Sequence, residues 1–190
     1  MRFNTLAYAV LGAALLGVCG CHAATSQVAQ PLAPELSKSD PDAQVEFWHA
    51  LPERKAVSHD EAFHALLLFA DGDDKSADYA GRVEALKQRK MLPGGFSGAA
   101  GEPVRRGTVA VALAQILTIR GGLTMHVFGA SPRYAVRELQ YAGLFPPSSP
   151  QQTFSGAEFL GIIGRAEDYQ RTQGPETLSP ESAGDTGGGV

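Results

Sequence analysis

The feature that most constrains the fold is a helix opening that occurs three times along the chain. Each copy starts with a hydrophobic residue, passes through polar or small residues and leads into an apolar helical pattern; the copies start at Val57, Val104 and Phe154. They lie 47 and 50 residues apart, a period typical of repeated helical units. Because one such unit cannot bury its hydrophobic face alone, the pattern predicts units that pack against one another.

A second helical pattern precedes each opening and carries two hydrophobic residues three positions apart. These pairs are Val45 and Trp48, Val83 and Leu86, and Val136 and Leu139. The sequence therefore predicts a mainly α fold of three helix-loop-helix quasi-repeats over residues 40–170. Residues 108–119 carry no charge and are apolar on nearly every face, which predicts a buried central helix around which the others pack.

Capping residues mark several of the helix starts. Ser58 with Glu61, and Ser155 with Glu158, have the spacing of capping boxes, in which side chain and backbone satisfy each other's hydrogen bonds. The pair Asp40-Pro41 places an N-cap residue ahead of a proline at the first helical position. These signals predict helices that begin near residues 41, 59 and 156.

These motifs resemble the S-layer homology repeat, whose pattern has an aromatic-Ala start, an aliphatic pair, a Gly-aliphatic turn and an Ile-Thr-Arg-Ala-Glu-Phe helix opening. The matching segments are Tyr79-Ala80 for the start, Met91-Leu92 and Gly143-Leu144 for the turn, and Val104-Arg105-Arg106 and Phe154-Ser155-Gly156-Ala157-Glu158-Phe159 for the opening. The resemblance spans residues 41–168 and implies a helical repeat fold similar to that family's. Lys90 departs from the pattern, because it stands where the turn glycine is expected.

The resemblance also implies a ligand. In that family the arginine of the opening helps to hold an anionic cell-wall glycan. Only Arg106 stands at that position here, because His59 and Gly156 replace the other two arginines. The implied glycan site therefore depends on the second opening.

Three arginines are the candidate anion-binding or glycan-binding residues: Arg105, Arg106 and Arg133. The first two lie at a helix opening beside the loop 94–101, and Arg133 lies on the helix that follows. Guanidinium groups next to the free N–H groups of a helix start suit a carboxylate or phosphate. The alternative is that Arg106 forms an ion pair with a local acid such as Glu102.

The N-terminus has the layout of a secretion signal. Arg2 supplies a positive charge, and residues 6–18 form an apolar run rich in Ala, Leu and Gly. The run is shorter than the roughly 20 apolar residues that a membrane-spanning helix needs. We therefore expect residues 1–20 to be a signal peptide that is removed.

The end of this signal resembles the lipobox of bacterial lipoproteins. It reads Val18-Cys19-Gly20-Cys21, in which a small residue gives the signal peptidase access and the next thiol carries the lipid. The resemblance implies that Cys21 is the lipid-modified first residue of the mature protein. The alternative is an ordinary secretory signal that is cut near Ala23 or Ala24.

Polar or glycine-rich segments flank the predicted domain. Residues 21–39 are polar and contain two prolines, which predicts a lipid-anchored flexible linker, and residues 171–190 are poor in apolar residues, which predicts a disordered tail. A membrane anchor at Cys21 would place the domain in the cell envelope, on the periplasmic or extracellular side. His22 stands where an aspartate would favour retention in the inner membrane of proteobacteria, so we expect the outer membrane.

Composition excludes several function classes. The predicted domain has no cysteine, which rules out a disulfide, a thiolate nucleophile or a cysteine metal site within it. Without residues 1–20, 15 Lys and Arg side chains remain against 20 Asp and Glu, because the signal contains Arg2 and no acid. This acidic balance argues against nucleic acid as a partner.

No motif predicts catalysis, a metal site or a cofactor. His59 and His64 are five residues apart and do not share a helix face as a metal-binding pair would, and His59 is expected at an exposed helix start. Counted from Asp71, the acidic turn 71–74 opens a stretch that lacks the glycine at the sixth position and the glutamate at the twelfth position of a calcium loop, so it is expected to be a solvated acidic turn. The loop 95–98 lacks the last glycine of a nucleophile elbow.

Two functions are compatible with these features. The first is a non-enzymatic envelope lipoprotein whose helical domain is a scaffold or interaction domain for an envelope protein. The second is a module similar to the S-layer homology domain that binds an anionic cell-wall glycan. A groove that combines basic and aromatic residues would favour the second function, whereas a flat apolar patch would favour the first.

Overall fold

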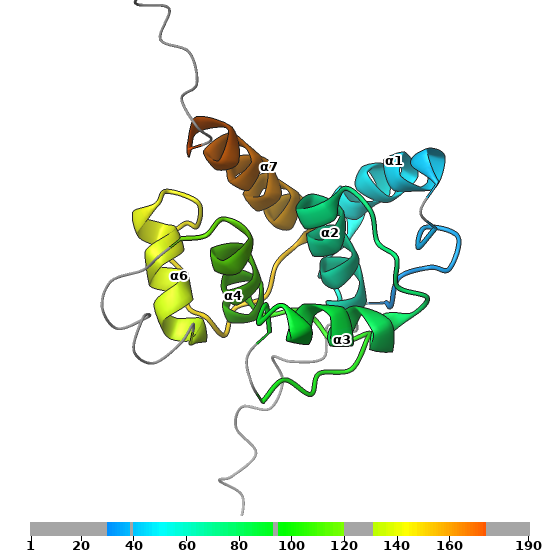
Figure 1. Ribbon diagram of the computed structural model, residues 1–190, viewed down its shortest axis with the longest axis horizontal. Coiled ribbons are helices and arrows are strands. Elements are labelled where there is room, and N and C mark those ends of the chain that lie inside the picture. Colours follow the sequence, from blue (N-terminus) through cyan, green and yellow to red (C-terminus); the bar gives the residue numbers. More distant parts are fainter. Residues whose placement is uncertain (1–29, 39, 93–94, 120–130, 174–190) are drawn as a thin grey trace, which may run out of the picture.

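The structure, a computed structural model, describes residues 30–38, 40–92, 95–119 and 131–173. These residues fold mainly into α-helices, as predicted (Figure 1). The helical elements are α1 (Pro41–Ala50), the 3-10 turn η1 (Leu51–Glu53), α2 (His59–Asp71), α3 (Tyr79–Gln88), α4 (Arg106–Ile116), α6 (Pro132–Tyr141) and α7 (Gly156–Gln173). The predicted signal peptide, Cys21 and residues 174–190 lie outside the described residues.

The predicted caps begin their helices. The Ser58 hydroxyl accepts from the Glu61 N–H at 3.2 Å, and the Glu61 carboxylate accepts from the Ser58 N–H at 3.0 Å. Ser155 and Glu158 exchange the same two bonds at 3.3 and 2.9 Å. Asp40 caps α1 by accepting from the N–H of residue 43 at 3.0 Å. Local sequence therefore determined where these helices begin.

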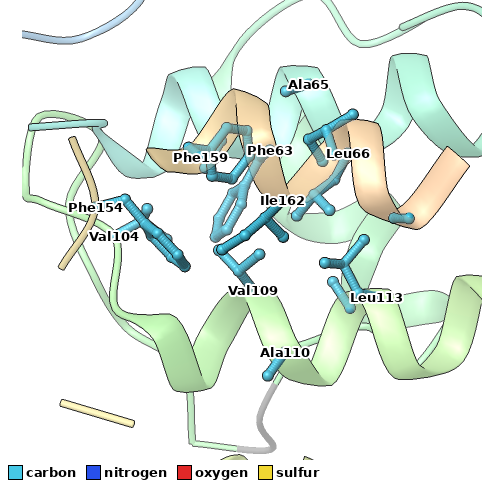
Figure 2. Packing of buried hydrophobic residues seen from close by; sticks show 14 of the residues in the cluster. Phe63, Ala65, Leu66, Val104, Val109, Ala110, Leu113, Phe154, Phe159 and Ile162 are labelled. Atoms are coloured by element: carbon cyan, nitrogen blue, oxygen red, sulfur yellow. The ribbon is translucent and has the colours of Figure 1, made fainter. Parts of the chain in front are cut away.

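Along the chain the helices alternate as the first and second helix of three units: α1 and α2, α3 and α4, and α6 and α7. The most extensive helix packing runs between units, α4 with α6 and α2 with α3, and the second helices of the three units meet in the centre. Figure 2 shows side chains of α2, α4 and α7 meeting there. The buried residues at this meeting include Phe63 and Leu66 of α2, Val109 and Leu113 of α4, and Phe159 and Ile162 of α7. The helix α4 is buried from Arg106 to Ala114, as predicted for its first part, but it ends at Ile116, and residues 115–119 are exposed or half-buried, unlike the prediction for residues 108–119. The helix α2 is buried from His59 to Leu68. The core is thus shared by three helices.

Backbone hydrogen bonds join the three helix openings into a closed ring. Each opening donates an N–H to the segment just before the next opening, and the third donates back to the first. The bonds run from His59 to the Glu102 carbonyl at 2.9 Å, from Arg106 to the Gln152 carbonyl at 2.7 Å, and from Gly156 to the Arg54 carbonyl at 2.8 Å. The three units therefore depend on one another, as the repeat spacing predicted.

The second and third units share the same turn after their first helix. The Met91 N–H donates to the Leu86 carbonyl at 2.9 Å, and the Leu144 N–H donates to the Leu139 carbonyl at 2.8 Å. The residues before these donors, Lys90 and Gly143, both have positive φ, 57° and 74°. Lys90 therefore adopts the left-handed conformation that usually favours glycine.

The first unit departs from the predicted register. Val45, one of the hydrophobic pair that defines the repeat in this unit, is 54% exposed, whereas Phe47 and Leu51 are buried at 2% and 1%. In place of the long turn this unit has η1, which is followed after three residues by the first opening at Val57. The residues that α1 buries therefore differ in register from those of α3 and α6.

The folded domain begins earlier and ends later than the sequence indicated. Leu32 is only 7% exposed and belongs to the core, so the predicted linker boundary at residue 40 is too late. At the other end α7 continues to Gln173, three residues past the predicted domain end at 170. None of the described helices has the length and apolar character that a membrane crossing requires.

Closure of the ring predicts a sharp difference between two glycines of α7. A Cβ at Gly156 would lie 1.7 Å from the Leu51 carbonyl oxygen, whereas a Cβ at Gly164 would meet nothing within 4 Å. We expect Gly156→Ala to lower the free energy of unfolding by about 3 kcal/mol, because the ring must move apart. Gly164→Ala should raise it by about 1 kcal/mol through helix propensity. Urea denaturation measures both, and equal effects would contradict the ring.

Candidate ligand groove

The loop between α3 and α4 and the three helix openings enclose a groove of about 780 Å³. The residues that line it are His59, Gly95, Phe96, Ser97, Gly98, Glu102, Pro103, Arg105, Thr108, Gln151 and Thr153. They come from the first opening, from the loop and second opening, and from the segment before the third. The groove therefore exists only because the ring brings these segments together.

The loop that forms one wall is held by α2 and α3. The Asp60 N–H donates to the Ala100 carbonyl at 3.1 Å, and the Tyr79 hydroxyl donates to the Gly98 carbonyl at 2.6 Å. Gly98 lies against the His59 ring so closely that a Cβ there would be 2.3 Å from it. The described part of this wall is thus fixed before any ligand arrives.

His59 is buried, not exposed as the sequence suggested, because this loop covers its ring. It is 6% exposed, and its ring packs edge to face with Phe96 at 5.0 Å. Its Nδ1 lies 2.9 Å from the Ala99 carbonyl oxygen, which can only accept, so Nδ1 carries the proton. Burial lowers the pKa of His59, an effect that the Ala99 hydrogen bond and Glu102 partly oppose. The imidazole is therefore neutral near pH 7 and keeps Nε2 as an acceptor.

Of the three predicted arginines, only Arg105 lines the groove. Its side chain is exposed and donates to the Gln151 side-chain oxygen at 2.8 Å. Arg133 is exposed on α6 but is not part of the groove lining. The second opening therefore contributes Arg105 to the groove, whereas the resemblance pointed to the neighbouring Arg106.

Arg106 has a structural role. Its side chain is 7% exposed, donates to the Glu158 carboxylate at 2.9 Å and lies over the Phe154 ring with its guanidinium carbon 4.8 Å from the centroid. The ion pair that the sequence offered as an alternative exists, but its partner is Glu158, 52 residues further on, and not Glu102. Glu102 instead accepts from the Ala99 N–H at 3.1 Å. The prediction of Arg106 as a ligand residue is not supported by this geometry.

The groove offers hydrogen-bonding groups with little net charge. With His59 neutral, its charged residues are Glu102 and Arg105, and the hydroxyls of Ser97, Thr108 and Thr153 add groups that both donate and accept. Phe96 supplies an aromatic ring beside them. The Ala99 carbonyl orients the His59 ring through Nδ1. The groove is equipped to bind a polar ligand.

A buried ion cluster lies on the other side of the first opening, and the sequence did not predict it. Arg82 is 1% exposed and donates to Asp74 at 2.5 Å and to Asp60 at 2.6 Å, while the His64 Nδ1 donates to Asp74 at 2.6 Å. The turn 71–74 is therefore not simply a solvated acidic turn, because Asp74 is 1% exposed. Burial alone would raise the pKa of Asp74, but the bonds from His64 and Arg82 lower it to about 2.

The described residues contain no group of three or more histidines and carboxylates that could hold a metal ion.

Comparison with protein-family models finds none that matches this chain, and comparison with curated protein sequences likewise finds no match. The groove must therefore be interpreted from its own chemistry.

The ion cluster makes the free energy of unfolding depend on pH. The folded pKa of Asp74, about 2, is below its ordinary 3.8, so its carboxylate stabilises the fold above about pH 4 and this contribution is lost as the pH falls towards 2. We expect Asp74→Asn to lower the free energy of unfolding at pH 7 by about 2 kcal/mol and to flatten its pH dependence.

Asp71→Asn is the matched control, because Asp71 forms an ion pair with Arg89 in which both side chains are more than a third exposed. It should cost less than about 1 kcal/mol. Urea denaturation between about pH 2 and pH 7 measures both variants. A pH profile of Asp74→Asn that is as steep as the wild-type profile would rule out this role of Asp74.

Proposed function

We propose that this chain is a cell-envelope lipoprotein whose helical domain is a non-enzymatic interaction domain. The lipobox-like sequence at Cys21 supports attachment to a membrane through lipid. The observation that carries the binding role is the groove at the junction of the three units, which has exposed polar groups and walls held by hydrogen bonds. The first candidate partner is another protein of the cell envelope, for which the domain would be a scaffold.

The preformed wall supports binding because little of it needs to be ordered when a partner arrives. The hydrogen bonds of Asp60 and Tyr79 hold the loop backbone, and the packing of His59 against Phe96 holds the ring that borders the groove. A preorganised site loses less conformational entropy on binding than a loop that must fold. The Ala99 carbonyl orients the His59 ring, whose Nε2 is the acceptor, and Gln151 orients the Arg105 guanidinium.

A cell-wall glycan is the second candidate, and the composition of the groove favours it. Phe96 offers an apolar ring face, the three hydroxyl residues offer partners for sugar hydroxyls, and Arg105 offers one cation for an acidic group. This is the combination of basic and aromatic residues that the glycan-binding alternative requires. The proposed glycan contact is Arg105, in place of Arg106, which is already paired with Glu158.

Membrane attachment depends on one thiol in this proposal. Cys21→Ala removes the atom that would carry the lipid, so the mature protein should move from the membrane fraction to the soluble fraction of the cell envelope. Immunoblots of fractions separated by ultracentrifugation measure the shift, and Cys19→Ala is the control that should remain attached. A Cys21→Ala protein that stays in the membrane fraction would contradict the lipid anchor.

Binding to isolated cell-wall sacculi tests the glycan candidate. We expect Arg105→Ala to reduce retention about tenfold, the effect of losing one charge-assisted hydrogen bond. Arg133→Ala removes an equally exposed arginine outside the groove lining and should bind like the wild type. Pull-down with purified sacculi measures the bound fraction.

Failure of retention separates the two candidates. If the wild type does not bind sacculi, or if both substitutions have the same effect, the glycan candidate is wrong. A photo-crosslinking residue at position 97, inside the groove, should then form an adduct with an envelope protein that the same residue at position 133 does not form. Absence of an adduct at position 97 would contradict the protein partner.

A further inference from the structure

We infer that residues 30–38, called the strap from here on, are a releasable part of the tether that sets how far the domain reaches from its anchor. The strap precedes α1 in the chain, and Ser37 near its end lies against Arg82 of α3 (Figure 1). The reach that we infer rests on the proposed lipid anchor at Cys21, whereas docking of the strap does not.

Two kinds of contact dock the strap on the domain. Leu32 is 7% exposed and belongs to the core, and Leu36 packs against the core from outside. The Ser37 hydroxyl accepts from the Arg82 Nη2 at 2.6 Å. A flexible linker would show neither a buried leucine nor a bond to a buried cation.

Arg82 has a specific reason to hold the strap. Its guanidinium is 1% exposed, and its Nε and Nη1 donate to Asp74 and Asp60, which leaves Nη2 for a third partner. Ser37 supplies that partner and covers this part of the ion cluster. When the strap is released, the Arg82 Nη2 loses the Ser37 hydroxyl as its acceptor. Release also exposes this part of the ion cluster to solvent, so a water molecule can accept the hydrogen bond instead.

The docked state is balanced against release. Two leucines and one side-chain hydrogen bond favour docking, while the ordering of nine residues opposes it. Pro31 and Pro34 reduce that opposing entropy, because proline restricts the undocked chain as well. An element of this kind opens locally while the rest of the domain stays folded.

Release of the strap roughly doubles the greatest length that the tether between Cys21 and the domain can reach. With the strap docked, residues 22–29 connect Cys21 to the domain, and at about 3.3–3.6 Å per residue they span at most about 30 Å. With the strap released, residues 22–39 span at most about 60 Å. A partner bound in the groove and held away from the membrane would favour the longer, released form.

Tryptic cleavage after Lys38 tests the docking on the full-length lipidated protein. The Lys38 side chain is exposed in the docked strap, but trypsin must bind several residues before the cleaved bond in extended form, so the cleavage rate follows the fraction of released strap. We expect Ser37→Ala to raise this rate about tenfold, because Arg82 loses its partner, with little change in the thermal unfolding of the domain. Glu35→Ala, at an exposed position of the same segment, is the control and should cleave like the wild type.

The distance to the membrane tests the reach. Under the proposed processing the mature chain has no free thiol, so a fluorophore on Thr172→Cys is unique, and energy transfer to acceptors in a vesicle membrane reports its height. The Ser37→Ala protein should sit up to about 30 Å further from the membrane than the wild type. Equal cleavage rates in the wild type and in Ser37→Ala would overturn docking, and an unchanged height would overturn the reach. Loss of membrane attachment in both proteins would instead count against the lipid anchor.

Discussion

The three backbone hydrogen bonds that close the helix openings into a ring are the constraint on which the rest of the structure depends. Because each opening binds the segment before the next one, none of the units can take its position without the other two. The ring directs α2, α4 and α7 towards a common centre, where their apolar faces form the core. It also leaves the long loop of the second unit outside that centre, where it becomes the wall of the groove.

Equivalent positions of the ring have acquired different uses. His59, Arg106 and Gly156 donate the same backbone bond, yet their side chains do three things. His59 supports the groove loop, Arg106 pairs with Glu158 over the Phe154 ring, and the missing side chain of Gly156 lets the backbone approach Leu51. The repeat thus preserves a backbone arrangement while its side chains divide the work between stability and binding.

The fold was predictable where the sequence signals are local. Capping boxes and the period of the hydrophobic residues depend on neighbours within a few positions, and they predicted the helices and where several of them begin. They did not predict which helices pack together, because α4 packs mainly on α6 and α2 on α3, across the units. The site was predictable only in part, because its contacts join distant residues. Arg105 was among the candidates, but the partner of Arg106 lies in another unit, and burial of His59 depends on a loop 40 residues away. Arg82 gave one usable signal, since it shares the helical face of Tyr79 and Leu86 and therefore had to be buried with a counter-charge.

Native-state hydrogen exchange of the three ring amides tests most directly whether the units form one cooperative ring. The N–H groups of His59, Arg106 and Gly156 are the donors that close it. If the ring opens only when the whole domain unfolds, all three amides should exchange with the same free energy, equal to that of global unfolding. An exchange free energy for any one of them that is well below the global value would show that one unit leaves the ring independently, and would contradict a fold held together by its closure.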